Sequence, residues 1–524
     1  MLLQPSLHHH TKVSLSSTQA YSIIPRFNRP KTLSFRKSQV TVTCSISQIH
    51  SYGTMDYERR PAIKWNAVYK RISLMEKPEL GAASVLNQWE KEGQMLSKWE
   101  LCRVVKELRK YKRHEHALEV YEWMNNRGER FRFSSSDAAI QLDLIAKVHG
   151  VSSAEDFFTR LHDSLKDKRI YGALLNAYVR ATIREKAESL FDDMRSKGYA
   201  THHLPFNVMM TLYMNLKEHD KVESIVSEMM QKNIQLDTYS YNIWLSSCGS
   251  QGSAERMEHV FEQMKQDRTI NPNWTTFSTM ATVYIKLGQL DKALDCLKKV
   301  ESRITGRDRI PYHYLLSLYG SVGNKDEIYR VWNIYKTIFL SVPNMGYHGM
   351  ISSLIRVGDA EGAEKIYEEW LAVKSAFDPR IANLLMSWHV KDGNLDRAES
   401  IFNEMLEMGG KPNSITWEIL AEGHTGERRI SEALSCWKEA YAAVGSNKWK
   451  AKPASIAAFF KLCEDEADME SKEALVELMR QSHVGSFDGA LIGNKVSIVN
   501  GETDNDNDEI ENEEVLLNQG QGSI

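Results

Sequence analysis

The sequence predicts an all-α fold, a right-handed superhelical solenoid of helix-turn-helix repeats of about 35 residues. Three observations predict it: the chain is similar to itself at a lag of 35 residues, each window holds two amphipathic helical segments, and Gly or Pro separates the segments. The 524 residues are 42% hydrophobic and 26% charged, enough apolar surface for a continuous core. No apolar run approaches the length of a membrane span, so we expect no membrane insertion.

The amino-terminal segment, residues 1–44, predicts an organelle transit peptide. From Met1 to Met55 there is no Asp or Glu, while six Lys or Arg residues stand among many Ser and Thr residues. The run Val42-Thr43-Cys44-Ser45 resembles the processing sites of plant chloroplast transit peptides. We therefore expect localisation in the chloroplast, with the mitochondrion as the alternative.

The repeated windows begin at residues 98, 133, 168, 203, 238, 274, 309, 344, 379 and 414. In each window the first segment places apolar residues at i, i+3, i+4 and i+7, which puts them on one helical face. The second segment repeats this spacing with a small residue first. A single hairpin cannot bury both faces, so the windows must stack. Examples are Tyr171/Leu174/Leu175/Tyr178 for the first segment and Ala187/Leu190/Phe191/Met194 for the second.

The windows divide the chain into an array and its ends. We expect about ten repeats over residues 98–452, a degenerate repeat or cap at 63–97, and another at 453–487, because terminal repeats often diverge. Residues 488–524 are expected to form a disordered acidic tail, since Gly501 to Val515 holds eight acidic and no basic residues.

The repeats resemble pentatricopeptide repeats (PPR) of the plant organellar type, specifically the P class. The resemblance rests on the 35-residue period, the central Ala, the pair Tyr241-Asn242, and the endings Gly410-Lys411-Pro412-Asn413 and Gln235-Leu236-Asp237. The tetratricopeptide repeat fits less well, because its period is 34 residues and its signature differs.

The resemblance implies that the fifth and the last residue of each repeat read one RNA base, and that the second residue stacks on bases. Asn207 with Asp237 would then read U, Asn242 with Asn273 a pyrimidine, Ser278 with Asp308 a G, and Asn383 with Asn413 a pyrimidine. Tyr239 is the expected stacking residue, with Leu204 and Thr275 at the same position elsewhere. The other pairs match no standard combination: Cys102/Arg132, Asp137/Asp167, Gly172/His202, His313/Pro343, His348/Asp378 and Glu418/Lys452.

The sequence predicts no enzyme. It lacks a Gly-rich phosphate loop, His-Glu-x-x-His and Gly-x-Ser-x-Gly. No Cys or His follows residue 487, so the zinc ligands of a deaminase-like domain are absent there, and the six cysteines include no Cys-x-x-Cys. We therefore expect no catalytic residue, no metal and no cofactor.

Two functions fit these features. The first is an organellar adaptor that binds single-stranded RNA and acts in RNA processing, stability, splicing or translation. The second is a protein-interaction scaffold in an organellar complex such as the ribosome. The scaffold is favoured by the near-neutral net charge of -3, because RNA-binding proteins usually carry a basic excess.

Overall fold

The computed structural model describes residues 63–75, 80–305, 308–374, 376–444, 449 and 451–482. All of them belong to one compact unit that spans Pro61–Asp506; the other unit, Met1–Arg60 with Asn507–Ile524, is outside these ranges. The predicted transit peptide and acidic tail therefore lie outside the described residues, as does the end of the carboxyl-terminal cap.

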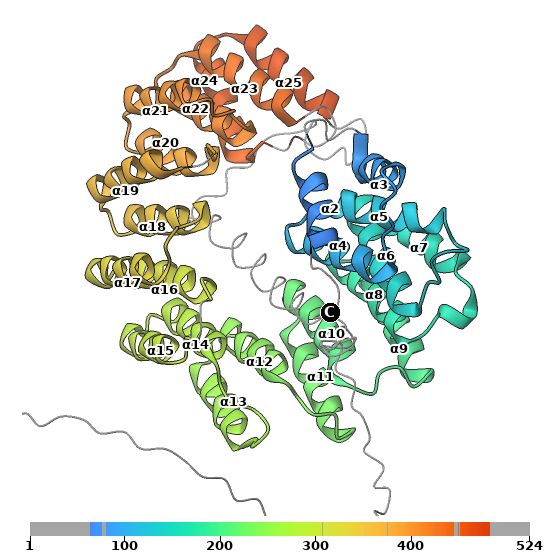
Figure 1. Cartoon of the computed structure of the whole chain (residues 1–524). Helices are drawn as coiled ribbons and strands as arrows, with labels where there is room; N and C mark the ends of the chain where they lie inside the picture. The colour runs from blue at the N-terminus through green and yellow to red at the C-terminus, as the bar shows by residue number, and fades with distance from the viewer. Residues whose placement is uncertain are drawn as a thin grey trace, which may run out of the picture. The chain divides into compact units, whose positions relative to one another are not determined.

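The described residues form helical hairpins and no strand, which confirms the predicted all-α repeat class (Figure 1). Each hairpin has a first and a second helix. The first helices are α2 (Ile63–Ser73), α4 (Lys98–Lys110), α6 (Ser135–Val148), α8 (Lys168–Arg180), α10 (His203–Asn215), α12 (Thr238–Ser250), α14 (Trp274–Lys286), α16 (Ile310–Val322), α18 (Asn344–Arg356), α20 (Pro379–Lys391), α22 (Ser414–Gly426) and α24 (Pro453–Asp465).

The second helices follow after short turns. They are α3 (Gly81–Lys91), α5 (His114–Asn125), α7 (Val151–Arg160), α9 (Arg184–Ser196), α11 (His219–Gln231), α13 (Ala254–Gln266), α15 (Leu290–Ser302), α17 (Lys325–Ile338), α19 (Ala360–Val373), α21 (Leu395–Glu407), α23 (Ile430–Val444) and α25 (Met469–Ser482). A short 3₁₀ helix, η2 (Asp163–Leu165), lies between α7 and α8.

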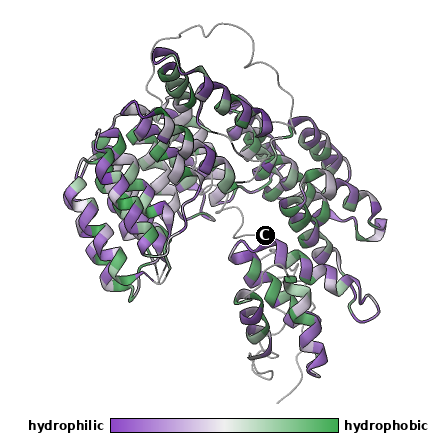
Figure 2. Cartoon of the chain, turned by 90° about the horizontal axis from the view of Figure 1, so that it is seen from above, coloured by the Kyte–Doolittle hydropathy of each residue, from purple (hydrophilic) through white to green (hydrophobic). Residues whose placement is uncertain are grey.

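The first helices from α6 to α24 form a continuous layer, because each contacts the first helix of the next hairpin. Apolar faces meet between the helices and polar faces point away (Figure 2). One core cluster runs from Ala138 to Leu475, and a second, from Val68 to Leu144, fills the amino-terminal hairpins. No described helix combines the length and the apolar composition that crossing a bilayer requires.

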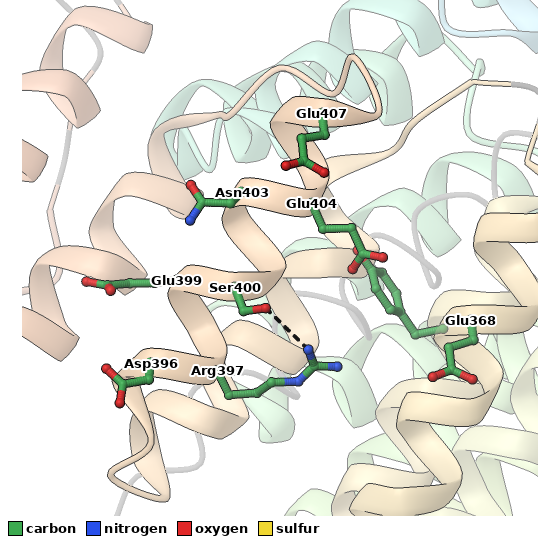
Figure 3. A pocket seen from close by; sticks show the side chains of 9 residues that line it. Glu368, Asp396, Arg397, Glu399, Ser400, Asn403, Glu404 and Glu407 are labelled. Atoms are coloured by element: carbon green, nitrogen blue, oxygen red, sulfur yellow. Dashed lines mark hydrogen bonds between the residues drawn. The ribbon is translucent and has the colours of Figure 1, made fainter.

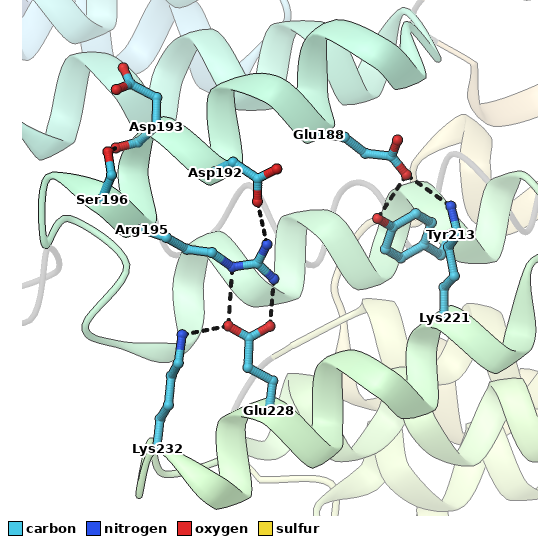
Figure 4. A network of polar contacts seen from close by, with 9 residues as sticks. All are labelled: Glu188, Asp192, Asp193, Arg195, Ser196, Tyr213, Lys221, Glu228 and Lys232. Atoms are coloured by element: carbon cyan, nitrogen blue, oxygen red, sulfur yellow. Dashed lines mark hydrogen bonds and ion pairs between the residues drawn. The ribbon is translucent and has the colours of Figure 1, made fainter.

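Polar contacts also join adjacent repeats at fixed positions (Figure 4). Glu188 on α9 accepts hydrogen bonds from the Tyr213 hydroxyl at 3.0 Å and from Lys221 Nζ at 2.9 Å, both in the next repeat. Further along the same helix, Arg195 donates from Nε to Glu228 at 3.1 Å. These contacts link neighbouring hairpins through polar side chains.

The repeat predicted to begin at residue 133 has a different register. Helix α6 begins at Ser135, after Ser134, which caps the helix by accepting from the Asp137 backbone N–H. Its buried Ala138 and Leu142 correspond to Tyr171 and Leu175 of α8 when the repeat is counted from 135. The fifth residue is therefore Ala139 rather than Asp137. The last residue of the repeat before it is Ser134 rather than Arg132.

Candidate nucleic-acid interface

Asn207 and Asp237, the fifth and last residues of one repeat, are in direct contact. Asn207 Nδ2 donates to Asp237 Oδ1 at 3.0 Å, and Asn207 Oδ1 accepts from the Ser240 hydroxyl at 2.6 Å. Asp237 is also the N-cap of α12, because its carboxylate accepts from the Ser240 backbone N–H. The last residue thus has two roles here: it starts the next helix and orients the amide of the fifth residue.

The same arrangement recurs five repeats later. Asn383 Nδ2 donates to Asn413 Oδ1 at 3.2 Å, and Asn383 Oδ1 accepts from the Thr416 hydroxyl at 2.9 Å. Asn413 caps α22 through the Thr416 backbone N–H. Two independent copies of one geometry indicate that the spacing of fifth residue, last residue and following hydroxyl produces it.

Asn242 and Asn273 are positioned differently. Asn242 Nδ2 donates to the Thr275 hydroxyl at 2.9 Å, while Asn273 caps α14 by accepting from the Thr276 backbone N–H at 3.2 Å. The Asn242 Oδ1 atom is buried and has no hydrogen-bond partner among the described residues. A buried carbonyl oxygen without a donor costs free energy, and in this conformation the Asn242 Oδ1 atom has almost no exposed surface.

Ser278 and Asp308 do not bond to each other. The Ser278 hydroxyl donates to the Trp274 carbonyl oxygen at 2.9 Å, on its own helix. Asp308 Oδ1 accepts from the Ile310 backbone N–H at 3.0 Å. Of the four predicted pairs, the structure therefore brings two into direct contact, links Asn242 to Asn273 through the Thr275 hydroxyl, and shows no hydrogen bond between Ser278 and Asp308.

The second residue is a large apolar or aromatic side chain in several repeats, although Arg169, Thr275 and Arg380 stand at this position in others. Tyr239 is half-buried and its hydroxyl lies 3.2 Å from the Thr211 hydroxyl. Three residues at the same position, Ile310, Met345 and Ile415, are 51%, 53% and 54% exposed. The 35-residue lag that located Tyr239 also locates them, so they could have been found from the sequence.

Charge is divided between the two helical layers. The first helices from α8 to α20 carry seven basic residues and no Asp or Glu, whereas the second helices from α9 to α21 carry 23 acidic and 14 basic residues. The thirteenth residue of the repeat is often basic, at the end of the first helix. These residues are Lys110, Lys147, Arg180, Lys286, Arg356 and Lys391.

Comparison with known proteins shows the family. The "Pentatricopeptide repeat domain" model matches residues 224–287, "PPR repeat family" matches 380–426, and "PPR repeat" matches 169–199, 205–234, 275–303 and 347–372. A pentatricopeptide repeat-containing protein of Arabidopsis thaliana is 63% identical over 484 residues, 92% of each chain. The chain belongs to the pentatricopeptide repeat family.

Other PPR relatives are more distant. A mitochondrial pentatricopeptide repeat-containing protein of Arabidopsis thaliana is 32% identical over 82% of this chain and 88% of its own. The large ribosomal subunit protein mL101 of the same plant is 33% identical over 82% and 88%. Among solved structures, maize PPR10 with an 18-nt psaJ RNA element is similar with 20% identity and a TM-score of 0.47 over 81% of this chain and 61% of that one.

Two PPR repeats have an ionisable fifth residue in a buried setting. Glu418 accepts from the Ser414 hydroxyl at 3.0 Å and from Trp449 Nε1 at 3.1 Å, and burial raises the pKa of its carboxyl. Nε2 of His313 lies 3.0 Å from the Tyr335 hydroxyl. Burial, reinforced by Arg309 and opposed by Asp308, lowers the pKa of His313 to about 4. Both side chains are engaged within the protein.

His313 should make the fold sensitive to acid. Its pKa is lower in the folded than in the unfolded chain, so its neutral form contributes fully above pH 6.5, and the contribution is lost as pH falls toward 4. We expect the neutral form of His313 to contribute at most about 3 kcal/mol to the free energy of unfolding. Urea unfolding at pH 7.5 and 5.0 should show a smaller pH effect for His313→Gln than for the wild type. An equal pH effect in both proteins would contradict the assignment.

Proposed function

We propose that this PPR protein is a non-enzymatic adaptor that binds single-stranded RNA along the layer of first helices. The observation that carries the proposal is that the first helices of the seven hairpins from α8 to α20, which hold the predicted fifth residues of the repeats, contain no Asp or Glu. These helices present no carboxylate of their own to a phosphate backbone, and the acidic residues at their amino-terminal ends, such as Asp237 and Asp308, accept hydrogen bonds from the backbone of the next helix. The near-neutral total charge conceals this surface because the second helices hold the carboxylates.

The placement of three code-compatible pairs in consecutive repeats supports a continuous contact with three bases. Asn207 with Asp237, Asn242 with Asn273 and Ser278 with Asp308 lie in three consecutive repeats and would read U, a pyrimidine and G. Asn383 with Asn413 would read a further pyrimidine. The exposed Ile310, Met345 and Ile415 add to Tyr239 as surfaces on which bases can stack.

The proposed location is a plant organelle, with the chloroplast preferred. The acid-free amino-terminal segment and Val42-Thr43-Cys44-Ser45 support the chloroplast. Several relatives named mitochondrial support the alternative. Import of residues 1–60 fused to a fluorescent protein into the two isolated organelles would distinguish them.

The basic residues at the thirteenth position provide the test of the RNA-binding proposal. For a 20-nt single-stranded RNA, Lys286→Ala with Lys391→Ala should make the negative slope of log affinity against log salt concentration shallower by about 1.4, because two phosphate contacts are lost. Both lysines are exposed. Affinity is measured by fluorescence anisotropy between 50 and 300 mM KCl.

Exposed lysines of the second helices give the matched control. Lys298→Ala with Lys365→Ala removes the same charge from the opposite layer and should leave the slope unchanged. An equal change in both variants would mean that RNA is held by overall charge. No detectable RNA binding at 50 mM KCl would reject the adaptor.

A protein scaffold is the second candidate. The similarity to mL101, which is named a large ribosomal subunit protein, favours it. Co-sedimentation of the tagged protein with organellar ribosomes after RNase treatment and a high-salt wash is the expected result for a scaffold. Release by RNase is the expected result for an adaptor.

A further inference from the structure

An acidic hollow lies on the second helices α19 and α21 (Figure 3). Helix α19 contributes Glu368 and α21 contributes most of the remaining wall. Together the hollow contains five carboxylates and one guanidinium. Its lining residues are Tyr367, Glu368, Asp396, Arg397, Glu399, Ser400, Asn403, Glu404 and Glu407.

The negative charge of this hollow is mostly uncompensated. Arg397 is already engaged, with its Nε 3.4 Å from Glu364 and its Nη1 3.4 Å from the Ser400 hydroxyl. Glu399 lies 3.8 Å from Arg429. Within the described part of the chain, the other four carboxylates form no ion pair. The hollow therefore favours a cationic occupant and repels a nucleic acid.

Tyr367 is a second, independent sign of an occupant. Its side chain is 2% exposed and lines the hollow, and its hydroxyl has no hydrogen-bond partner among the described residues. Burial and the nearby Glu404 raise the pKa of Tyr367, so the hydroxyl remains protonated. Phe191, Phe261 and Phe402 occupy this position in other repeats, as do the buried Val226 and Leu297, so packing at this position does not require a hydroxyl.

Apolar side chains stand at the carboxyl-terminal ends of the same two helices. Val373 at the end of α19 and Leu406 and Met408 at the end of α21 are all exposed. The two helix ends adjoin, because Lys374 Nζ lies 3.6 Å from Met408 Sδ. Exposed apolar residues beside unpaired carboxylates are typical of a surface that binds an amphipathic segment.

We propose that the hollow between α19 and α21 binds a lysine- or arginine-rich amphipathic segment of a partner protein. The cationic side chains of the segment lie among Glu368, Asp396, Glu404 and Glu407, and one of them or a backbone carbonyl bonds the Tyr367 hydroxyl. Its apolar side chains cover Val373, Leu406 and Met408. This surface lies on the second helices, so the inference goes beyond RNA binding and does not depend on it.

A synthetic helical peptide of 16 residues, with Lys on one face and Leu on the other, serves as the probe for the full-length protein. Glu404→Lys with Glu407→Lys should weaken binding of this peptide at least about tenfold, because two attractions become repulsions. The matched control, Glu185→Lys with Glu255→Lys, reverses two exposed carboxylates on α9 and α13 and should change binding less than about twofold. Circular dichroism verifies that both variants are folded.

Tyr367→Phe separates a binding role from a packing role. The variant loses an unpaired buried hydroxyl, so its Tm should not fall, whereas its affinity for the peptide should fall about threefold. Equal losses in the two charge variants would overturn the proposal, as would displacement of the peptide by a 20-nt RNA containing U-Y-G. Unchanged affinity in Tyr367→Phe would remove the hydroxyl from the site.

Discussion

Replacing Asn207, Asn242 and Ser278 together by alanine is expected to weaken binding to an RNA containing U-Y-G about 100-fold. Each side chain is proposed to meet one base edge, and a good base contact contributes about 1–3 kcal/mol. Fluorescence anisotropy with a labelled 20-nt RNA measures the loss.

A second RNA separates lost recognition from lost folding. Asn207 also bonds Asp237 and Ser240 across the repeat boundary, so its replacement removes contacts within the protein. If recognition is lost, the triple variant binds the U-Y-G RNA and an A-A-C RNA equally, because the wild type's preference disappears. If the repeats unfold, binding to both RNAs falls together and the helical signal falls with it.

Polar residues on the second helices supply the matched control. Asn333→Ala with Gln231→Ala removes two exposed amides from the opposite layer and should leave the affinity for both RNAs unchanged. Unchanged preference for U-Y-G in the triple variant would show that these three residues do not read bases.

The repeat class was predictable because contacts between neighbouring repeats hold a solenoid together. Each repeat therefore requires apolar residues at the same spacing, and this spacing recurs in the sequence. The register of the repeat that begins at Ser135 was not predictable. Two extra residues before Ser134 move the start of this helix along the chain, but the apolar spacing within the helix is unchanged. Comparing the sequence with itself at a constant lag of 35 residues does not detect such an insertion. The N-cap, a Ser three residues before an Asp, marks the true start.

The candidate surfaces were predictable to different degrees. The fifth and last positions of the repeat predict that Asn207 lies beside Asp237, and the two side chains are in contact in the structure. The same positions predict an equivalent contact for Asn242, but its amide bonds the Thr275 hydroxyl instead. Net charge conceals the division of charge between the layers, which appears only once each residue is assigned to a first or second helix. Tyr367 occupies an apolar core position, so only the structure shows that its hydroxyl lacks a partner.

Replacing Trp370 by alanine is expected to destabilise the carboxyl-terminal repeats by about 3–5 kcal/mol, because it leaves a large cavity. Trp370 is fully buried, packs against Phe377 with ring centres 5.0 Å apart, and donates from Nε1 to Asn344 Oδ1 at 3.0 Å. In the control Trp370→Phe, a benzene ring is kept, whereas the pyrrole part of the indole and this hydrogen bond are lost. We expect that variant to lose about 1–3 kcal/mol, less than Trp370→Ala.

The effect of Trp370→Ala should be local, since each repeat of a solenoid contacts only its neighbours. Hydrogen exchange measured by mass spectrometry should show lower protection in α18 to α21 and unchanged protection in α8 to α11. The three consecutive pairs that we propose to read bases end at Asp308, before the damaged region, so the expected preference for U-Y-G should survive. The contact with the pyrimidine proposed for Asn383 should be lost, and the protected RNA footprint should shorten at one end. Equal loss of protection in all repeats would instead show that the array unfolds as one cooperative unit.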